Sequence, residues 1–88
     1  MSPNSERYLQ VINNRSVEVT FVLELWGETY PMPTGARFDI TLIGDPSTLL
    51  QIRVDDQYIE FFAPQGNTAR VFYDGRELGP GTAARMPY

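Results

Sequence analysis

The residue types that perform most protein chemistry are missing from this chain of 88 residues, which contains no cysteine, histidine or lysine. Without cysteine there is no thiol nucleophile, and without histidine there is no ordinary zinc site and no base that titrates near neutral pH. Without lysine there is no Schiff base and no Walker-type phosphate site. The serines and threonines therefore lack their usual activating partners, and the composition predicts a non-enzyme without cofactor or metal.

The carboxylates are the remaining groups that could act as acids, bases or cation ligands. Asp55-Asp56 and Asp74-Gly75 are the most compact acidic positions, and both have the composition of tight turns. A catalytic carboxylate pair also needs a cleft, for which so small a domain has little volume. No calcium-binding loop of the EF-hand type is present. These positions are therefore interpreted as turn formers.

Arginines interleaved with aromatic residues form the pattern most suggestive of binding. All seven cations are arginines, and Tyr, Trp and Arg are enriched at the centres of protein interfaces. If the strands that carry them are neighbours, these side chains share one sheet face and bind a partner there. The alternative is that they line a second small core. The predicted binding residues are Trp26, Tyr30, Arg53, Tyr58, Phe62, Arg70 and Phe72.

Alternating apolar residues predict that short strands position these side chains. Period-two alternation over residues 17–25 predicts a strand of nine or ten residues with one buried face. Its inward positions are Val17, Val19, Phe21, Leu23 and Leu25. Residues 8–12 predict a further short strand, and residues 37–42 predict another that has Phe38, Ile40 and Leu42 inward.

Two hairpins are predicted in the second half of the chain. A two-residue turn at Asp55-Asp56 places Ile52 opposite Ile59 on an apolar face. The opposite face then holds Arg53, Tyr58, Glu60 and Phe62. Farther along, Asp74-Gly75 predicts a type I′ turn, which pairs Val71 with Leu78.

Prolines at positions 31 and 33 lack an amide proton, so the segment Tyr30–Pro33 is predicted to be an extended edge or a loop. Such a segment either blocks edge-to-edge pairing or, beside Trp26, forms a recognition surface. The edge-blocking interpretation is favoured. The stretch from Tyr30 to Phe38 loosely resembles strand connections in small bacterial β-domains, a resemblance that assigns no role to any residue.

Seven glycines and seven prolines fall between the apolar runs, as expected for short strands joined by turns. The predicted fold is all-β: one small sandwich or partly open barrel of six to seven short, mostly antiparallel strands. Residues 8–78 form this single domain. Residues 1–7 and 79–88 have no pattern and are predicted to be flexible tails.

The charge balance favours protein partners. A formal net charge of −4 steers a molecule toward basic proteins, and scattered arginines are a poor match to a nucleic-acid backbone. The absence of a membrane-length apolar run and of a visible signal peptide predicts a cytoplasmic protein that does not bind membranes.

The function predicted from these features is a non-catalytic protein–protein interaction module, such as a small acidic inhibitor, an immunity-type protein or an assembly adaptor. A carbohydrate or small-ligand binding β-domain is the alternative, because exposed aromatic rings can stack on apolar ring faces. A thin core and exposed strand edges also favour a homodimer.

Overall fold

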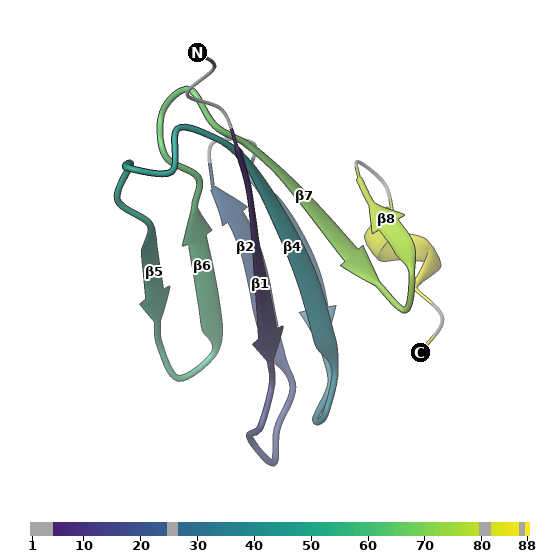
Figure 1. Cartoon of the computed structure of the whole chain (residues 1–88). Coiled ribbons are helices and arrows are strands. Elements are labelled where there is room, and N and C mark those ends of the chain that lie inside the picture. The colour runs from purple at the N-terminus through teal and green to yellow at the C-terminus, as the bar shows by residue number, and fades with distance from the viewer. Residues whose placement is uncertain (1–4, 25–26, 80–81, 87) are drawn as a thin grey trace.

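Two four-stranded sheets pack face to face in the computed structural model, which describes residues 5–24, 27–79, 82–86 and 88 (Figure 1). The strand orders are β1-β4-β7-β8 and β3-β2-β6-β5. The prediction of a small all-β sandwich is confirmed, with eight strands where six or seven were expected. The elements are β1 Ser5–Ile12, β2 Val19–Glu24, β3 Glu28–Met32, β4 Arg37–Gly44, β5 Gln51–Val54, β6 Tyr58–Phe62, β7 Thr68–Tyr73, β8 Arg76–Leu78 and the 3-10 helix η1 Thr82–Arg85.

The core follows from the alternation in β2 and β4. Every second residue of these strands is buried, because the two strands belong to different sheets and turn their apolar faces toward each other. Phe21 and Phe38 meet across the interior in an edge-to-face contact with 5.4 Å between ring centroids. Phe38 also contacts Tyr30 of β3 in the same manner, at 6.4 Å. The predicted inward positions of β4 are confirmed.

The long strand predicted over residues 17–25 is shorter. β2 starts at Val19, and Val17 is 51% exposed in the turn that precedes it. Val17 is therefore no core residue, because its carbonyl is already bound by the side chain of Asn13 within that turn. Leu25 lies outside the described residues.

The β7–β8 hairpin agrees with its prediction. Asp74 and Gly75 have φ values of 51° and 80°, as a type I′ turn requires. Val71 lies opposite Leu78, and both are buried.

The β5–β6 hairpin has a different register from the predicted one. Val54 pairs with Ile59 and Ile52 pairs with Phe61, so the two-residue turn lies at Asp56-Gln57 in place of Asp55-Asp56. The loop is closed by the Asp55 amide, which donates to the Tyr58 carbonyl at 2.8 Å. The register error is two residues, and an even shift leaves each side chain on its predicted face.

Both predicted tails contain regular structure. β1 begins at Ser5, where it pairs with Gly44, three residues before the expected start of the domain. At the other end η1 follows β8, Met86 packs against the core, and the ring of Tyr88 lies 5.1 Å from that of Tyr73.

The chain changes sheets four times, twice at each end of the sandwich. At one end, residues 13–18 lead from β1 to β2 and residues 33–36 lead from β3 to β4. At the other end, residues 45–50 lead from β4 to β5 and residues 63–67 lead from β6 to β7. The relative position of the sheets therefore depends on how these connections are held.

Asn13 fixes the first end. Its buried side-chain amide donates to the carbonyls of Val17, at 2.9 Å, and Met32, at 2.7 Å. Its side-chain oxygen accepts from the Arg15 amide at 3.0 Å. One side chain thus joins the end of β1, the turn into β2 and the last residue of β3.

Asn67 occupies the corresponding place at the second end. It is 8% exposed, and its side-chain amide donates to Thr48 Oγ1 at 3.2 Å, across to the other connection. Its Oδ1 lies against Gly44, where an added Cβ would be only 2.3 Å away. Asn13 and Asn67 are the buried polar side chains of the described chain.

Replacing Asn13 with alanine should lower the free energy of unfolding by roughly 2–3 kcal/mol, because the buried Met32 carbonyl and the part-buried Val17 carbonyl would lose their donor. Urea unfolding followed by tryptophan or tyrosine fluorescence measures this loss. The matched control is Asn14→Ala, which changes an exposed residue of the same turn and should cost less than about 0.5 kcal/mol. Equal effects of the two substitutions would show that Asn13 does not hold the connections.

Gly44→Ala should destabilise the protein by about 1–3 kcal/mol, because its Cβ would overlap the Asn67 amide. Adding Asn67→Ala should recover part of this loss, so the double variant should be more stable than the sum of the single effects predicts. Gly79→Ala is the control, since nothing lies within 4 Å of a Cβ there. Strictly additive effects at positions 44 and 67 would contradict the proposed contact.

Candidate interaction surface

The predicted aromatic–arginine residues do not form one face. Arg53, Tyr58 and Phe62 lie on the outer face of the sheet that contains β5 and β6. Arg70 and Phe72 lie on the outer face of the other sheet, because β7 pairs with β4 and β8. The expectation of a shared face is therefore wrong: β6 and β7 follow each other along the chain but belong to different sheets.

On the first outer face, the arginine is occupied by its own neighbours. Arg53 Nη1 lies 3.5 Å from Glu60 Oε1, directly across the β5–β6 ladder. Its guanidinium carbon also lies 5.6 Å from the centroid of the Phe62 ring. The phenyl face that could stack on a ligand is thus covered by a guanidinium of the same chain.

The second outer face repeats this arrangement with better geometry. Arg70 donates two hydrogen bonds to Glu77, at 3.0 and 2.6 Å, in a bidentate pair between β7 and β8. The guanidinium lies 5.3 Å from the ring centroid of Phe72. Hydrogen bonds from Arg70 lower the pKa of the Glu77 carboxyl, and the same contact raises the pKa of Arg70. Both arginines are therefore engaged within the chain.

Tyr30 and Trp26 do not contribute to a described surface. Tyr30 is 2% exposed, because it occupies an inward position of β3 and packs on Phe38. Its predicted binding role is therefore wrong. Trp26 lies outside the described residues. β3 itself is an edge strand that contains Pro31, in agreement with the edge-blocking interpretation.

A different surface is open, at the side of the sandwich formed by β1, β5 and β6. Across the inner face of the second sheet, exposure rises from Phe61 of β6 at 0% to Ile52 of β5 at 44% and Val54 at 72%. These residues point toward the interior by alternation, but no described strand of the other sheet covers β5. In Figure 1, β5 and β6 extend to the left of β1.

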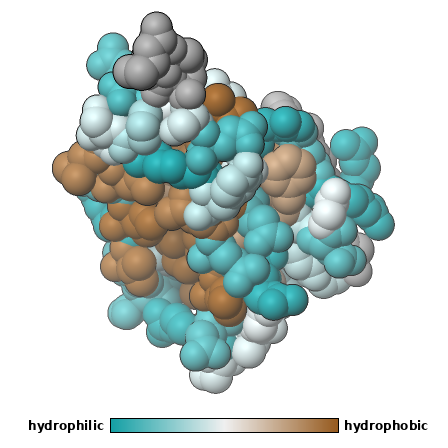
Figure 2. All heavy atoms as spheres, viewed as in Figure 1, coloured by the Kyte–Doolittle hydropathy of each residue, from teal (hydrophilic) through white to brown (hydrophobic). Residues whose placement is uncertain are grey.

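This region, hereafter the open side, is a continuous apolar surface. Figure 2 shows apolar atoms gathered over β5, β6 and the neighbouring part of β1. A groove of about 350 Å³ runs between these strands. The apolar residues that line it are Val11, Ile12, Val19, Ile52, Val54 and Ile59. Exposed apolar patches of this kind mark interaction sites in soluble proteins.

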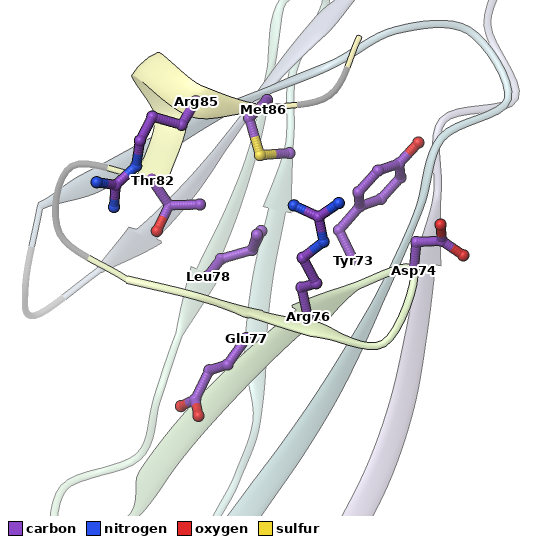
Figure 3. Close-up of a pocket in the computed structure, with 8 residues that line it drawn as sticks. All are labelled: Tyr73, Asp74, Arg76, Glu77, Leu78, Thr82, Arg85 and Met86. Carbon is purple, nitrogen blue, oxygen red and sulfur yellow. The ribbon is translucent and has the colours of Figure 1, made fainter.

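A smaller hollow of about 200 Å³ lies between the β7–β8 hairpin and η1. In Figure 3 the Arg76 side chain reaches into it between Tyr73 and Met86, whereas Arg85 and Glu77 point away from its centre. The volume is below the usual range of small-molecule sites, about 300–1,000 Å³. The guanidinium groups do not converge on a common point, so this hollow is a weaker candidate than the open side.

Of the residues of the open side, Ile52 and Ile59 are predicted from the sequence to lie together on one apolar face of the β5–β6 hairpin. Ile52 and Ile59 were expected on a buried face, and they do lie on the inner face of their sheet. Ile59 is partly buried against the core, whereas Ile52 is exposed because β5 is the last strand of that sheet. The sequence shows a short strand that ends at Asp55-Asp56. It does not show whether a strand of the other sheet covers that short strand.

Within the described residues, no group of three or more His, Cys, Asp or Glu side chains is placed to hold a metal ion. No helix in the same part of the chain is long and apolar enough to cross a membrane. Comparison with protein families, curated proteins and solved structures finds no match to this chain.

The buried position of Tyr30 predicts a loss of stability at alkaline pH. Burial and a hydrogen bond to Glu28, at 3.0 Å, raise the pKa of the Tyr30 hydroxyl. The unfolded chain releases this proton near pH ~10 while the folded protein keeps it, so the stabilisation is complete below that pH and is lost as the pH rises above it.

Tyr30→Phe should therefore reduce the slope of unfolding free energy against pH above pH ~10, although Tyr88, whose pKa is raised to about 12, preserves part of the slope. Urea titrations at a series of alkaline pH values measure it. Tyr58→Phe, at an exposed ring, is the control and should keep the parental slope. An unchanged slope in Tyr30→Phe would contradict the buried position of the hydroxyl.

Proposed function

We propose that this protein is a non-catalytic protein–protein interaction module that binds its partner through the open side. The observation that supports this proposal is the exposure of Ile52 and Val54 on the inner face of a sandwich sheet. Burying one such side chain fully contributes about 1.5–3 kcal/mol. This is a sizeable fraction of the free energy of unfolding of a whole domain, which is about 5–15 kcal/mol. A partner that covers these residues would gain this contribution.

The composition supports a binding role over a catalytic one. The chain lacks cysteine, histidine and lysine, and the groove of the open side is lined mostly by aliphatic side chains. Its polar lining residues are Gln10, Asn13, Asn14, Arg15 and Asp55, and a largely aliphatic groove of this kind fits a protein interface better than a reaction site. A small acidic inhibitor or an assembly adaptor would have these properties.

The alternative of a carbohydrate-binding domain has less support. Sugars bind to exposed aromatic faces, but Phe62 and Phe72 each have one face covered by an arginine of the same chain. Aliphatic side chains, which cannot offer the flat stacking surface of an aromatic ring, line the open side instead.

The proposal predicts that partner binding depends on position 54. A photo-crosslinking amino acid at Val54 should yield a discrete adduct in cells of the source organism, and the same group at Thr29, an exposed residue of the edge strand β3, should not. The captured protein is then purified and titrated against the unmodified chain by calorimetry.

In that titration Val54→Asp should weaken binding by roughly tenfold or more, because a carboxylate would be buried against apolar surface. Thr29→Asp is the matched control and should leave the affinity unchanged. Since Val54 is 72% exposed, both variants should keep the parental melting temperature. Equal binding by the two variants, or equal crosslinking from both positions, would rule out the open side as the binding surface.

A further inference from the structure

The four strand edges of the sandwich are not equally protected. β3 contains Pro31, which cannot donate to an added strand. β5 has four residues and β8 has only three, and η1 follows β8 directly. β1, in contrast, is eight residues long and contains no proline. Long edges without such protection are templates for pairing with another chain.

The edge of β1 borders the open side. β1 is the outermost strand of its sheet, and Val11 and Ile12 line the same groove as Ile52 and Val54 of β5. In Figures 1 and 2 the sheet with β5 and β6 extends past β1 on this side, and apolar atoms occupy the exposed part. A strand added beside β1 would therefore lie over the uncovered residues of β5 and β6.

We infer that the open side accepts an extended segment of a basic partner protein, which pairs with β1 as a fifth strand of its sheet. This inference rests on the proposed function and specifies the partner's chemistry. Alternate side chains of the segment would face Ile52, Val54 and Ile59, so they are apolar, and the others face water. The backbone ladder with β1 supplies affinity, and the apolar contacts supply register.

Charge complementarity indicates which residues should flank the apolar part of the partner segment. Two carboxylates, Glu6 and Asp45, lie near one end of the β1 edge, and Asp55 and Asp56 lie near the other. Two arginines are close to these positions. Arg7 binds oxygens of Asp45 and Thr48, and Arg15 binds the Asp56 carbonyl.

Acidic side chains thus lie near both ends of the β1 edge, at the rim of the open side, in a chain whose formal net charge is −4. A segment with arginine or lysine on both sides of its apolar part therefore fits this rim. A second copy of this chain, which has a net charge of −4, would instead oppose one acidic rim with another. The charges thus favour a basic partner over a homodimer.

The test uses a synthetic peptide of alternating valine and threonine, as long as β1, with arginines at both ends. Binding is measured by NMR titration of the full chain, and hydrogen exchange shows which amides become protected. We expect new protection of the alternate amides between Ser5 and Ile12 that point away from β4, and shifted methyl signals at Ile52, Val54 and Ile59. The same peptide with glutamates at its ends should bind at least about tenfold more weakly at low salt.

Two N-methylated peptides test the backbone ladder. In a strand, the amides of alternate residues point to the same side, so N-methyl groups on the valines and on the threonines block opposite edges. One of the two peptides should bind like the parent, and the other should lose binding. A peptide that used only its side chains would be affected equally by both modifications.

Variants of the protein connect the peptide to the open side. Val54→Asp should weaken peptide binding roughly tenfold, and Thr29→Asp should not change it. Equal binding of both N-methylated peptides, or protection of β5 in place of β1, would overturn the inference. A dimer in sedimentation equilibrium that Val54→Asp dissociates would also overturn it, in favour of a second copy.

The outcome separates this inference from the proposed function. If the peptides do not bind but the crosslinked partner still binds in a manner that depends on Val54, strand addition is wrong and the interaction surface stands. If neither the peptides nor a captured partner depend on Val54, both are wrong.

Discussion

Asn13 and Asn67 determine how the two sheets of this sandwich are placed on each other. Each end of the molecule contains two connections that cross between the sheets, and each end has one buried asparagine that bonds across them. The backbone of Asn13 adds to this, since its amide donates to Ala36 and its carbonyl accepts from Gly35. Three hydrogen-bonding groups on one short side chain can fix several strands at once, which apolar contacts alone, being non-directional, cannot do.

The open side follows from that placement. With the crossings fixed, Phe38 of β4 lies against Phe21 and Tyr30, so the interior is centred on β2, β3 and β4. The sheet with β5 then extends beyond β1, and the inner residues of β5 have no strand above them. Ordinary burial would favour a fifth strand at this place. The chain has none among its described residues, and this is where the proposed partner strand would lie.

Much of the fold could be predicted from the sequence, because local signals decide it. The alternation in β4 and the Asp74-Gly75 turn each depend on neighbouring residues, and both appear as expected. The register of β5–β6 was missed because the local sequence is compatible with a two-residue turn at Asp55-Asp56 or at Asp56-Gln57. The division of the arginine–aromatic residues between two faces could not be predicted, since it depends on which sheet each hairpin joins. Tyr30 was assigned to a surface, but it occupies an inward position of β3, whose alternate residues Tyr30 and Met32 are buried.

The outward aromatics and the open side differ in a way that bears on function. Arg53 covers Phe62 and Arg70 covers Phe72, and each arginine is also paired with a glutamate across the ladder. These contacts hide aromatic surface and keep both outer faces charged, which opposes association there. The arginines at the ends of the open side bind the backbone of the connecting loops instead: Arg7 binds the Asp45 carbonyl and Arg15 binds the Asp56 carbonyl. The apolar groove beside them is left uncovered, and this contrast favours the proposed interaction surface at the strand edges over the sheet faces where Arg53 and Arg70 lie.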